Sequence, residues 1–121
     1  MTEAEWKVMR EVWDHAPATA RDVVKGLGSS SSWAYTTVKT LLTRLVAKGA
    51  LCERMEGNTA VYEPLLSEAE ARRSAVRDVI ERAFGGSLAP MVRYLVDEEE
   101  LTARDVAKIR KALDREAKRK R

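Results

Sequence analysis

The stretch SSSSWAYTTVKTLLTRLVAKG, residues 29–49, decides how the N-terminal half of the chain folds. Its apolar residues recur at i, i+3, i+4 and i+7, which is the spacing of one buried stripe on an α-helix. These residues are Val38, Leu41, Leu42 and Leu45. The sequence therefore predicts a helix that packs one side against a core and ends at the glycine that closes the stretch.

The opposite side of this predicted helix carries threonines. At about 100° per residue, Thr36, Thr40 and Thr43 lie opposite the buried stripe. Threonine is a poor helix former, and no Asp or Glu occurs between Asp22 and Glu53. Short hydroxyl side chains without acids favour a face that closely approaches a polyanion such as DNA, where threonine can offer a hydrogen bond or a methyl group for thymine. The alternative is an ordinary solvated helix face.

Two capping boxes predict the helices that precede this one. Each places a hydroxyl three residues before a carboxylate, at Thr2–Glu5 and at Thr19–Asp22. The first helix is expected to bury Trp6, Met9, Val12 and Trp13. One of the serines in 29–32 is expected to cap the third helix.

A β-hairpin is predicted over residues 51–64, because β-favouring residues flank Gly57-Asn58. Whether the region of Thr19 adds a third strand stays open at this point. Three helices followed by a hairpin are the element order of a winged helix-turn-helix. The expected fold is mainly α with a small β-wing, comprising a winged helix-turn-helix DNA-binding domain over residues 1–66 and a helical dimerisation domain over residues 67–121.

The C-terminal region reads as three further helices. Ser67 opens a long charged helix that ends at Phe84-Gly85-Gly86, Ser87 can cap the next helix, and Thr102 caps the last. The terminal residues REAKRKR are expected to form a basic, frayed tail. Three short helices make a poor monomeric core, so we expect a homodimer. The predicted dimerisation residues are Phe84, Leu88, Met91, Val92, Leu95, Val96, Ile109 and Leu113.

Four segments, AEWKVMREVW, TVKTLLTRLVAKG, YEPL and FGGSLAPMVRYL, resemble the penicillinase-repressor family of bacteria, the BlaI/MecI type. The resemblance implies a homodimeric repressor whose winged helices bind an inverted-repeat operator, and recognition contacts from Thr36, Thr37, Lys39, Thr40 and Arg44. It also implies a sensor protease as inducing partner. The Asn-Phe bond cleaved in well-known members corresponds to Tyr94-Leu95 here, which does not match it. The paired C-terminal cysteines of the copper-responsive branch are missing.

The predicted DNA-binding residues combine the threonine face, its flanking cations and the hairpin. They are Ser32, Thr36, Thr37, Lys39, Thr40, Thr43, Arg44, Arg54 and Asn58. Lys39, Arg44, Lys48 and Arg54 are the candidate phosphate contacts. For Arg54, a cross-strand ion pair with a glutamate is an equal alternative. Trp33 either stacks at the helix start or touches DNA.

Other classes of protein are disfavoured by composition. One histidine, His15, and one cysteine, Cys52, give no nucleophile–base pair by spacing, so we expect no enzyme, metal site or cofactor. No long apolar run or basic–apolar leader occurs, so a cytoplasmic protein without a membrane partner is expected. The alternative function is a helical protein-interaction adaptor whose basic tail contacts RNA or membrane. Deletion of residues 116–121 would abolish nucleic-acid binding by such an adaptor, whereas a winged-helix repressor would largely keep its binding.

Overall fold

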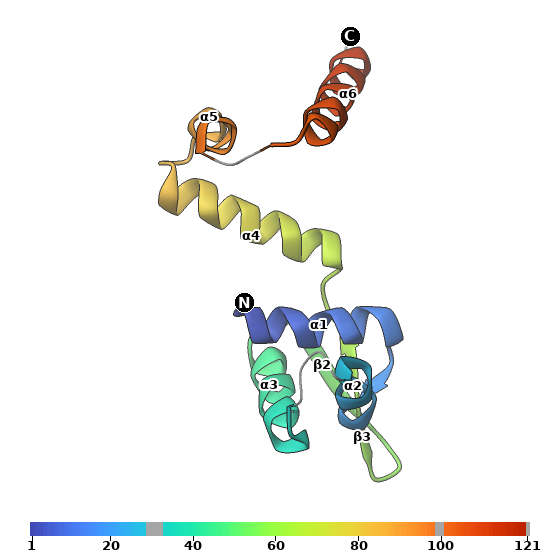
Figure 1. Cartoon of the computed structure of the whole chain (residues 1–121). Helices are drawn as coiled ribbons and strands as arrows, with labels where there is room; N and C mark the ends of the chain where they lie inside the picture. The colour runs from blue at the N-terminus through green and yellow to red at the C-terminus, as the bar shows by residue number, and fades with distance from the viewer. Residues whose placement is uncertain (29–32, 99–100, 121) are drawn as a thin grey trace. The chain divides into compact units, whose positions relative to one another are not determined.

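The computed structural model describes residues 1–28, 33–98 and 101–120. The N-terminal elements are α1 (Glu3–His15), β1 (Ala18–Thr19), α2 (Ala20–Leu27), α3 (Tyr35–Ala47), β2 (Leu51–Glu56) and β3 (Thr59–Pro64). The C-terminal elements are α4 (Glu68–Ala83), α5 (Leu88–Glu98) and α6 (Ala103–Arg119). The predicted mainly helical fold with a small sheet is confirmed (Figure 1).

The elements form two compact units, Met1–Ala75 and Val76–Arg121. The division falls inside α4, later in the chain than the expected boundary between residues 66 and 67. The beginning of α4 belongs with the first unit because Ala71 is buried there and Leu66 packs against the N-terminal core. No helix in the described parts of the chain is both long and apolar enough to span a bilayer.

The core of the first unit is built from one apolar face of each helix and the inner side of the sheet. Its buried members are Val8, Met9, Val12, Ala18, Ala20, Val23, Leu27, Val38, Leu41, Leu42, Leu45, Ala50, Leu51 and Tyr62. All four residues of the predicted α3 stripe are among them, which confirms the helical period. Because α3 buries this stripe, its opposite face lies outward.

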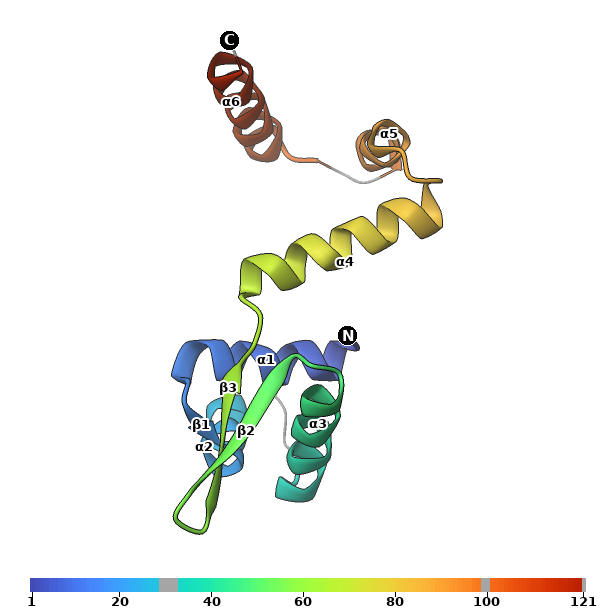
Figure 2. The same cartoon turned by 180° about the vertical axis from the view of Figure 1, so that it is seen from behind.

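The hairpin is confirmed, and a third strand joins it. Strands β2 and β3 pair antiparallel from Leu51↔Pro64 to Glu56↔Thr59, and Gly57 turns the chain with a φ of 62°. Strand β1 pairs with the other edge of β3, giving the order β1-β3-β2. Figure 2 shows the hairpin extending beyond α2 and α3 on the side away from α1. Thr19 both belongs to β1 and caps α2 through the predicted capping box, so the start of α2 is fixed to the sheet.

Trp6 and Trp13 are both half-buried rather than fully buried, and of the two Trp13 packs against the core as expected. The buried line of α1 runs through Val8, Met9 and Val12, and the two indoles flank it with ring centroids 6.0 Å apart. Trp13 Nε1 donates a hydrogen bond of 3.0 Å to the Leu66 carbonyl. The amphipathic indole therefore fixes the chain between β3 and α4 while one edge stays near solvent.

Two further local expectations are wrong, and two are confirmed. Helix α3 has Ala34 as its N-cap and no side-chain capping bond, whereas serines 29–32 lie outside the described residues. The C-terminal residues are helical as far as Arg119, which pairs with Glu116 at 2.8 Å, rather than frayed. The capping boxes at Ser67 and Thr102 form as predicted.

An ion pair between a buried carboxylate and a half-exposed lysine joins the start of α1 to the end of α3. Glu5 is 1% exposed, and its carboxylate accepts hydrogen bonds from Thr2 N at 2.8 Å and from Lys48 Nζ at 2.8 and 2.9 Å. Burial alone would raise the pKa of Glu5, but the bonds from Lys48 and Thr2 outweigh it and lower the pKa from 4.5 to about 2. The carboxylate is thus charged in the folded state and holds α3 against α1.

Substitution of Lys48 by alanine should lower the free energy of unfolding by about 2–3 kcal/mol, because it leaves a buried charge unpaired. This is below the ~3–5 kcal/mol typical of fully buried pairs, since the Lys48 side chain is 53% exposed. Arg44→Ala removes an equal charge from the same helix and should cost about 0.5 kcal/mol or less. Urea unfolding followed by tryptophan fluorescence measures both, and equal losses would contradict the role of the pair.

The same pair predicts an acid dependence. The pKa of Glu5 is lower in the folded than in the unfolded state, so its stabilisation is present above about pH 4.5 and is lost as pH falls toward 2. Lys48→Ala should reduce this loss, because the folded-state pKa of Glu5 then rises toward its unfolded value. Urea unfolding at pH 6 and pH 3 measures the free energy of unfolding of both proteins. If this free energy falls as much between the two pH values in Lys48→Ala as in the wild type, the prediction is wrong.

Candidate nucleic-acid interface

The outward face of α3 carries the threonine row that the sequence predicted. Thr36, Thr40 and Thr43 are all exposed, and the buried stripe of α3 faces the core. Thr37, the next predicted contact, is also exposed. The threonines therefore meet solvent and are available to a ligand.

Two of these hydroxyls are bonded to the helix itself. Thr40 Oγ1 donates to the Thr36 carbonyl and Thr43 Oγ1 donates to the Lys39 carbonyl, both at 2.9 Å. Such bonds to the preceding turn are a common way for threonine to satisfy its hydroxyl within a helix. The single proton of each hydroxyl is thus already used, although an oxygen lone pair remains.

Lys39 turns toward the sheet rather than outward. Its ammonium donates a 2.5 Å hydrogen bond to Tyr62 Oη and lies 5.1 Å from the centroid of the same ring. The bond to Tyr62 raises the pKa of Lys39 above 10.5, so the ammonium stays charged. Tyr62 is fully buried, which means that Lys39 ties α3 to β3.

The other candidate phosphate contacts differ in their availability. Arg44 is exposed, and among the described residues no ion pair of Arg44 is found. Lys48 is bound to Glu5. Arg54 forms the ion-pair alternative, with Glu56 at 2.6 Å and across the strands with Glu63 at 3.4 Å. The bonds to Glu56 and Glu63 raise the pKa of Arg54.

The remaining sequence candidates lie at the two ends of this surface. Asn58 is exposed in the turn of the hairpin. Trp33 is half-buried and packs against the core, with Lys7 Nζ 5.7 Å from the centroid of its ring. Ser32 lies outside the described residues.

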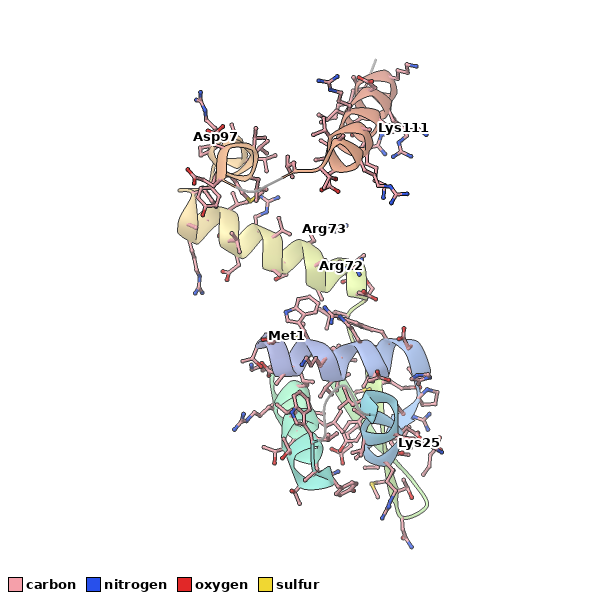
Figure 3. The ribbon with its side chains drawn as sticks, in the orientation of Figure 1. Met1, Lys25, Arg72, Arg73, Asp97 and Lys111 are labelled. Atoms are coloured by element: carbon pink, nitrogen blue, oxygen red, sulfur yellow. The ribbon has the colours of Figure 1, made fainter. Side chains whose placement is uncertain are left out.

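A groove between α2, α3 and the hairpin combines the predicted Asn58 with residues that the sequence analysis missed. It has a volume of about 490 Å³, and its lining includes Arg21, Tyr35, Met55 and Asn58. The Arg21 guanidinium lies 5.6 Å from the centroid of the Tyr35 ring. Arg21 directly precedes Asp22 and therefore lies just outside the acid-free stretch of the sequence. Lys25, also on α2, is labelled in Figure 3.

The predicted dimerisation residues lie in the second unit and remain largely uncovered. Phe84 and Met91 are half-buried, and Phe84 packs against Tyr94 with ring centroids 6.0 Å apart. The other six are exposed, from 40% for Leu95 to 64% for Leu113. They are Leu88, Val92, Leu95, Val96, Ile109 and Leu113. Figure 3 shows charged side chains extending from α6 as well, with Lys111 labelled.

Comparison with known proteins identifies the family. The model of the family described as penicillinase repressor matches residues 1–115. The chain belongs to the penicillinase repressor family. The resemblance seen in the sequence is therefore confirmed, and membership of this family favours a repressor over a helical adaptor.

Relatives of known name cover almost the whole chain. It is 29% identical over 120 residues to the penicillinase repressor of Bacillus licheniformis, which covers 99% of this chain and 94% of that protein. It is 24% identical over 115 residues to the methicillin resistance regulatory protein MecI of Staphylococcus aureus, covering 95% and 94% of the two chains.

Two solved structures match part of this penicillinase repressor family member. The solution structure of the DNA-binding domain of the repressor BlaI is 37% identical, with a TM-score of 0.52, and covers 58% of this chain and 85% of that one. Monomeric BlaI of Bacillus licheniformis in complex with the blaP half-operator matches with the same identity and coverage and a TM-score of 0.50. The winged-helix assignment of the fold is thereby confirmed.

Substitution of Tyr62 by phenylalanine should lower the free energy of unfolding by about 1 kcal/mol, because it removes the acceptor of Lys39 while the ring remains buried. The matched control is Tyr35→Phe at a 47% exposed ring, which should change stability by less than about 0.5 kcal/mol. Urea unfolding of the two variants tests the difference. A Tyr62→Phe variant as stable as the wild type would mean that the hydrogen bond does not hold α3 to β3.

Proposed function

We propose that the chain is a homodimeric transcriptional repressor that binds an inverted-repeat operator in double-stranded DNA. It acts by binding rather than by catalysis and works in the cytoplasm. The observation that carries this proposal is the exposed, acid-free threonine face of α3. The similar repressor BlaI has been solved in complex with a half-operator, which supports DNA as the ligand of this face.

Helix α3 is the proposed recognition helix, lying in the major groove. An α-helix fits that groove, and residues toward its N-terminal end usually contact base edges. The exposed row of Thr36, Thr40 and Thr43 would face the bases, with Thr37 beside it. Arg44 would reach a phosphate or a guanine edge.

The hairpin and α2 would contact the DNA backbone on either side. Asn58 lies exposed in the hairpin turn, and Arg21 and Lys25 lie on α2 near the start of α3. Lys39, Lys48 and Arg54 contribute less to this scheme than their charge suggests, because each has a partner within the protein. Arg44 is therefore the central phosphate contact in our proposal.

Dimerisation is proposed to occur through residues 76–121. Large apolar side chains of α5 and α6 are exposed in the single chain, including Leu95, Val96 and Leu113. Their burial against a second copy would remove this apolar surface from water. A two-fold dimer would also place two α3 helices on the half-sites of an inverted repeat, about 34 Å apart.

A sensor protease as partner is implied by the family resemblance alone. The bond at the matching position, Tyr94-Leu95, lies within helix α5 and has a different residue pair. We therefore do not propose cleavage at this bond.

Arg44→Ala should reduce the salt dependence of DNA binding, whereas Lys48→Ala should not. Each phosphate contact adds about 0.9 to the slope of log K against log salt, so loss of Arg44 from both protomers should lower the slope by about 2. Binding is measured by fluorescence anisotropy with a duplex selected from a random pool. Circular dichroism confirms that both variants are folded. Equal slopes for the two variants would contradict the assignment of Arg44.

Leu95→Asp should yield monomers and lose most of the affinity for the two-half-site duplex, because a carboxylate would enter an apolar interface. Sedimentation at micromolar protein concentration measures the oligomeric state without DNA. Arg93→Asp introduces a carboxylate on the same helix and serves as the control for helix stability. A wild-type chain that sediments as a monomer would refute the dimer.

A further inference from the structure

We propose that the exposed row of α3, Thr36, Thr40, Thr43 and Ala47, recognises thymine through its C5-methyl group rather than by donating hydrogen bonds to bases. The inference rests on the proposed function, since it concerns how α3 reads its operator. It specifies which chemical group on the DNA the threonine face selects.

The hydroxyl protons of Thr40 and Thr43 are unavailable to DNA bases. A threonine hydroxyl has one proton to donate, and those of Thr40 and Thr43 are given to the carbonyls of Thr36 and Lys39 at 2.9 Å. Guanine N7 and O6, adenine N7 and thymine O4 accept hydrogen bonds in the major groove. Neither threonine can donate to them without breaking a bond within its own helix.

The row presents methyl groups to a ligand. A hydroxyl bonded to the preceding turn restricts χ1, so the methyl groups of Thr40 and Thr43 occupy defined positions on the surface. Ala47 is exposed and continues the row at the spacing i, i+4, i+7, i+11, with nothing but a methyl to offer. The row is thus a line of methyl groups along one helix face.

Thymine is the base that presents a methyl group in the major groove, and alanine and threonine methyls are its usual apolar partners. The row contains no carboxylate, amide or guanidinium that could favour another base. Arg44, which can bind guanine, lies beside the row rather than in it. Thymine is therefore the base that this face favours.

The experiment uses the full chain and a duplex selected from a random pool. Each thymine is replaced in turn by deoxyuridine, which removes the methyl group and keeps all hydrogen bonds. At contacted positions the wild type should bind about fourfold more weakly, the ratio that corresponds to burial of one methyl-sized group. The loss should occur at one or two positions in each half-site.

Matched variants separate the methyl from the hydroxyl. Thr40→Val and Thr43→Val keep a methyl and remove the hydroxyl, so both should bind within about twofold of the wild type and remain sensitive to deoxyuridine. Thr40→Ser and Thr43→Ser keep the hydroxyl and remove the methyl. In a homodimer each variant loses the methyl in both half-sites, so it should bind the thymine duplex as weakly as the wild type binds a duplex with deoxyuridine at the contacted position of both half-sites. It should also lose the sensitivity to deoxyuridine at that position. The control variant Thr37→Ser, which lies outside the row, should stay as sensitive to deoxyuridine as the wild type.

The outcomes are distinguishable. Tight binding of the selected duplex with no effect of deoxyuridine would overturn this inference and leave the proposed function standing. Valine variants that lose as much affinity as serine variants would also overturn it, because the hydroxyl oxygen would then be accepting a bond from adenine or cytosine. Failure to select any duplex would overturn the inference together with the proposed function.

Discussion

The buried carboxylate of Glu5 is the constraint on which the placement of α3 depends. A charge with 1% exposure is tolerated only when it is fully bonded, and here Thr2 and Lys48 supply the bonds. One acceptor thus caps α1 and anchors the C-terminal end of α3. Together with the buried stripe of α3, it fixes which face of the helix remains outside.

Three cations that the sequence predicts as phosphate contacts have partners within the protein instead. Lys48 is bound to Glu5, Lys39 to Tyr62, and Arg54 to two glutamates of the hairpin. The outward face of α3 is left with short side chains and one flanking arginine, Arg44. Recognition by such a face would depend more on close fit and apolar contact than on charge, which suits selectivity because phosphate contacts carry no sequence information.

Much of the fold could be predicted because its signals are local. A capping box needs only residues i and i+3, the α3 stripe needs one helical period, and the hairpin needs a turn between β-favouring runs. The partners of Lys48 and Lys39 could not be predicted in this way. Glu5 is 43 residues from Lys48 and Tyr62 is 23 residues from Lys39, and only the folded core brings them together.

The errors in the sequence analysis have physical causes of the same kind. The helical spacing of Trp6 and Trp13 predicts that both are core residues, but both are half-buried, and the indole N–H of Trp13 bonds the Leu66 carbonyl at the edge of the core. The basic C-terminus was expected to fray, yet the capping box at Thr102 and the pair of Arg119 with Glu116 support helix α6 nearly to its end. The third strand, which the sequence left open, pairs Ala18 and Thr19 with the edge of β3, more than 40 residues along the chain.

The central claim is that α3 presents its threonine face to DNA, and methyl-selective NMR of threonine tests it most directly. The full chain, labelled at threonine methyl groups, is titrated with a duplex selected from a random pool. The account predicts that the methyl signals of Thr36, Thr40 and Thr43 shift most, while that of Thr102, at the start of α6, moves little. Shifts confined to Thr102, with the α3 threonines unchanged, would contradict it.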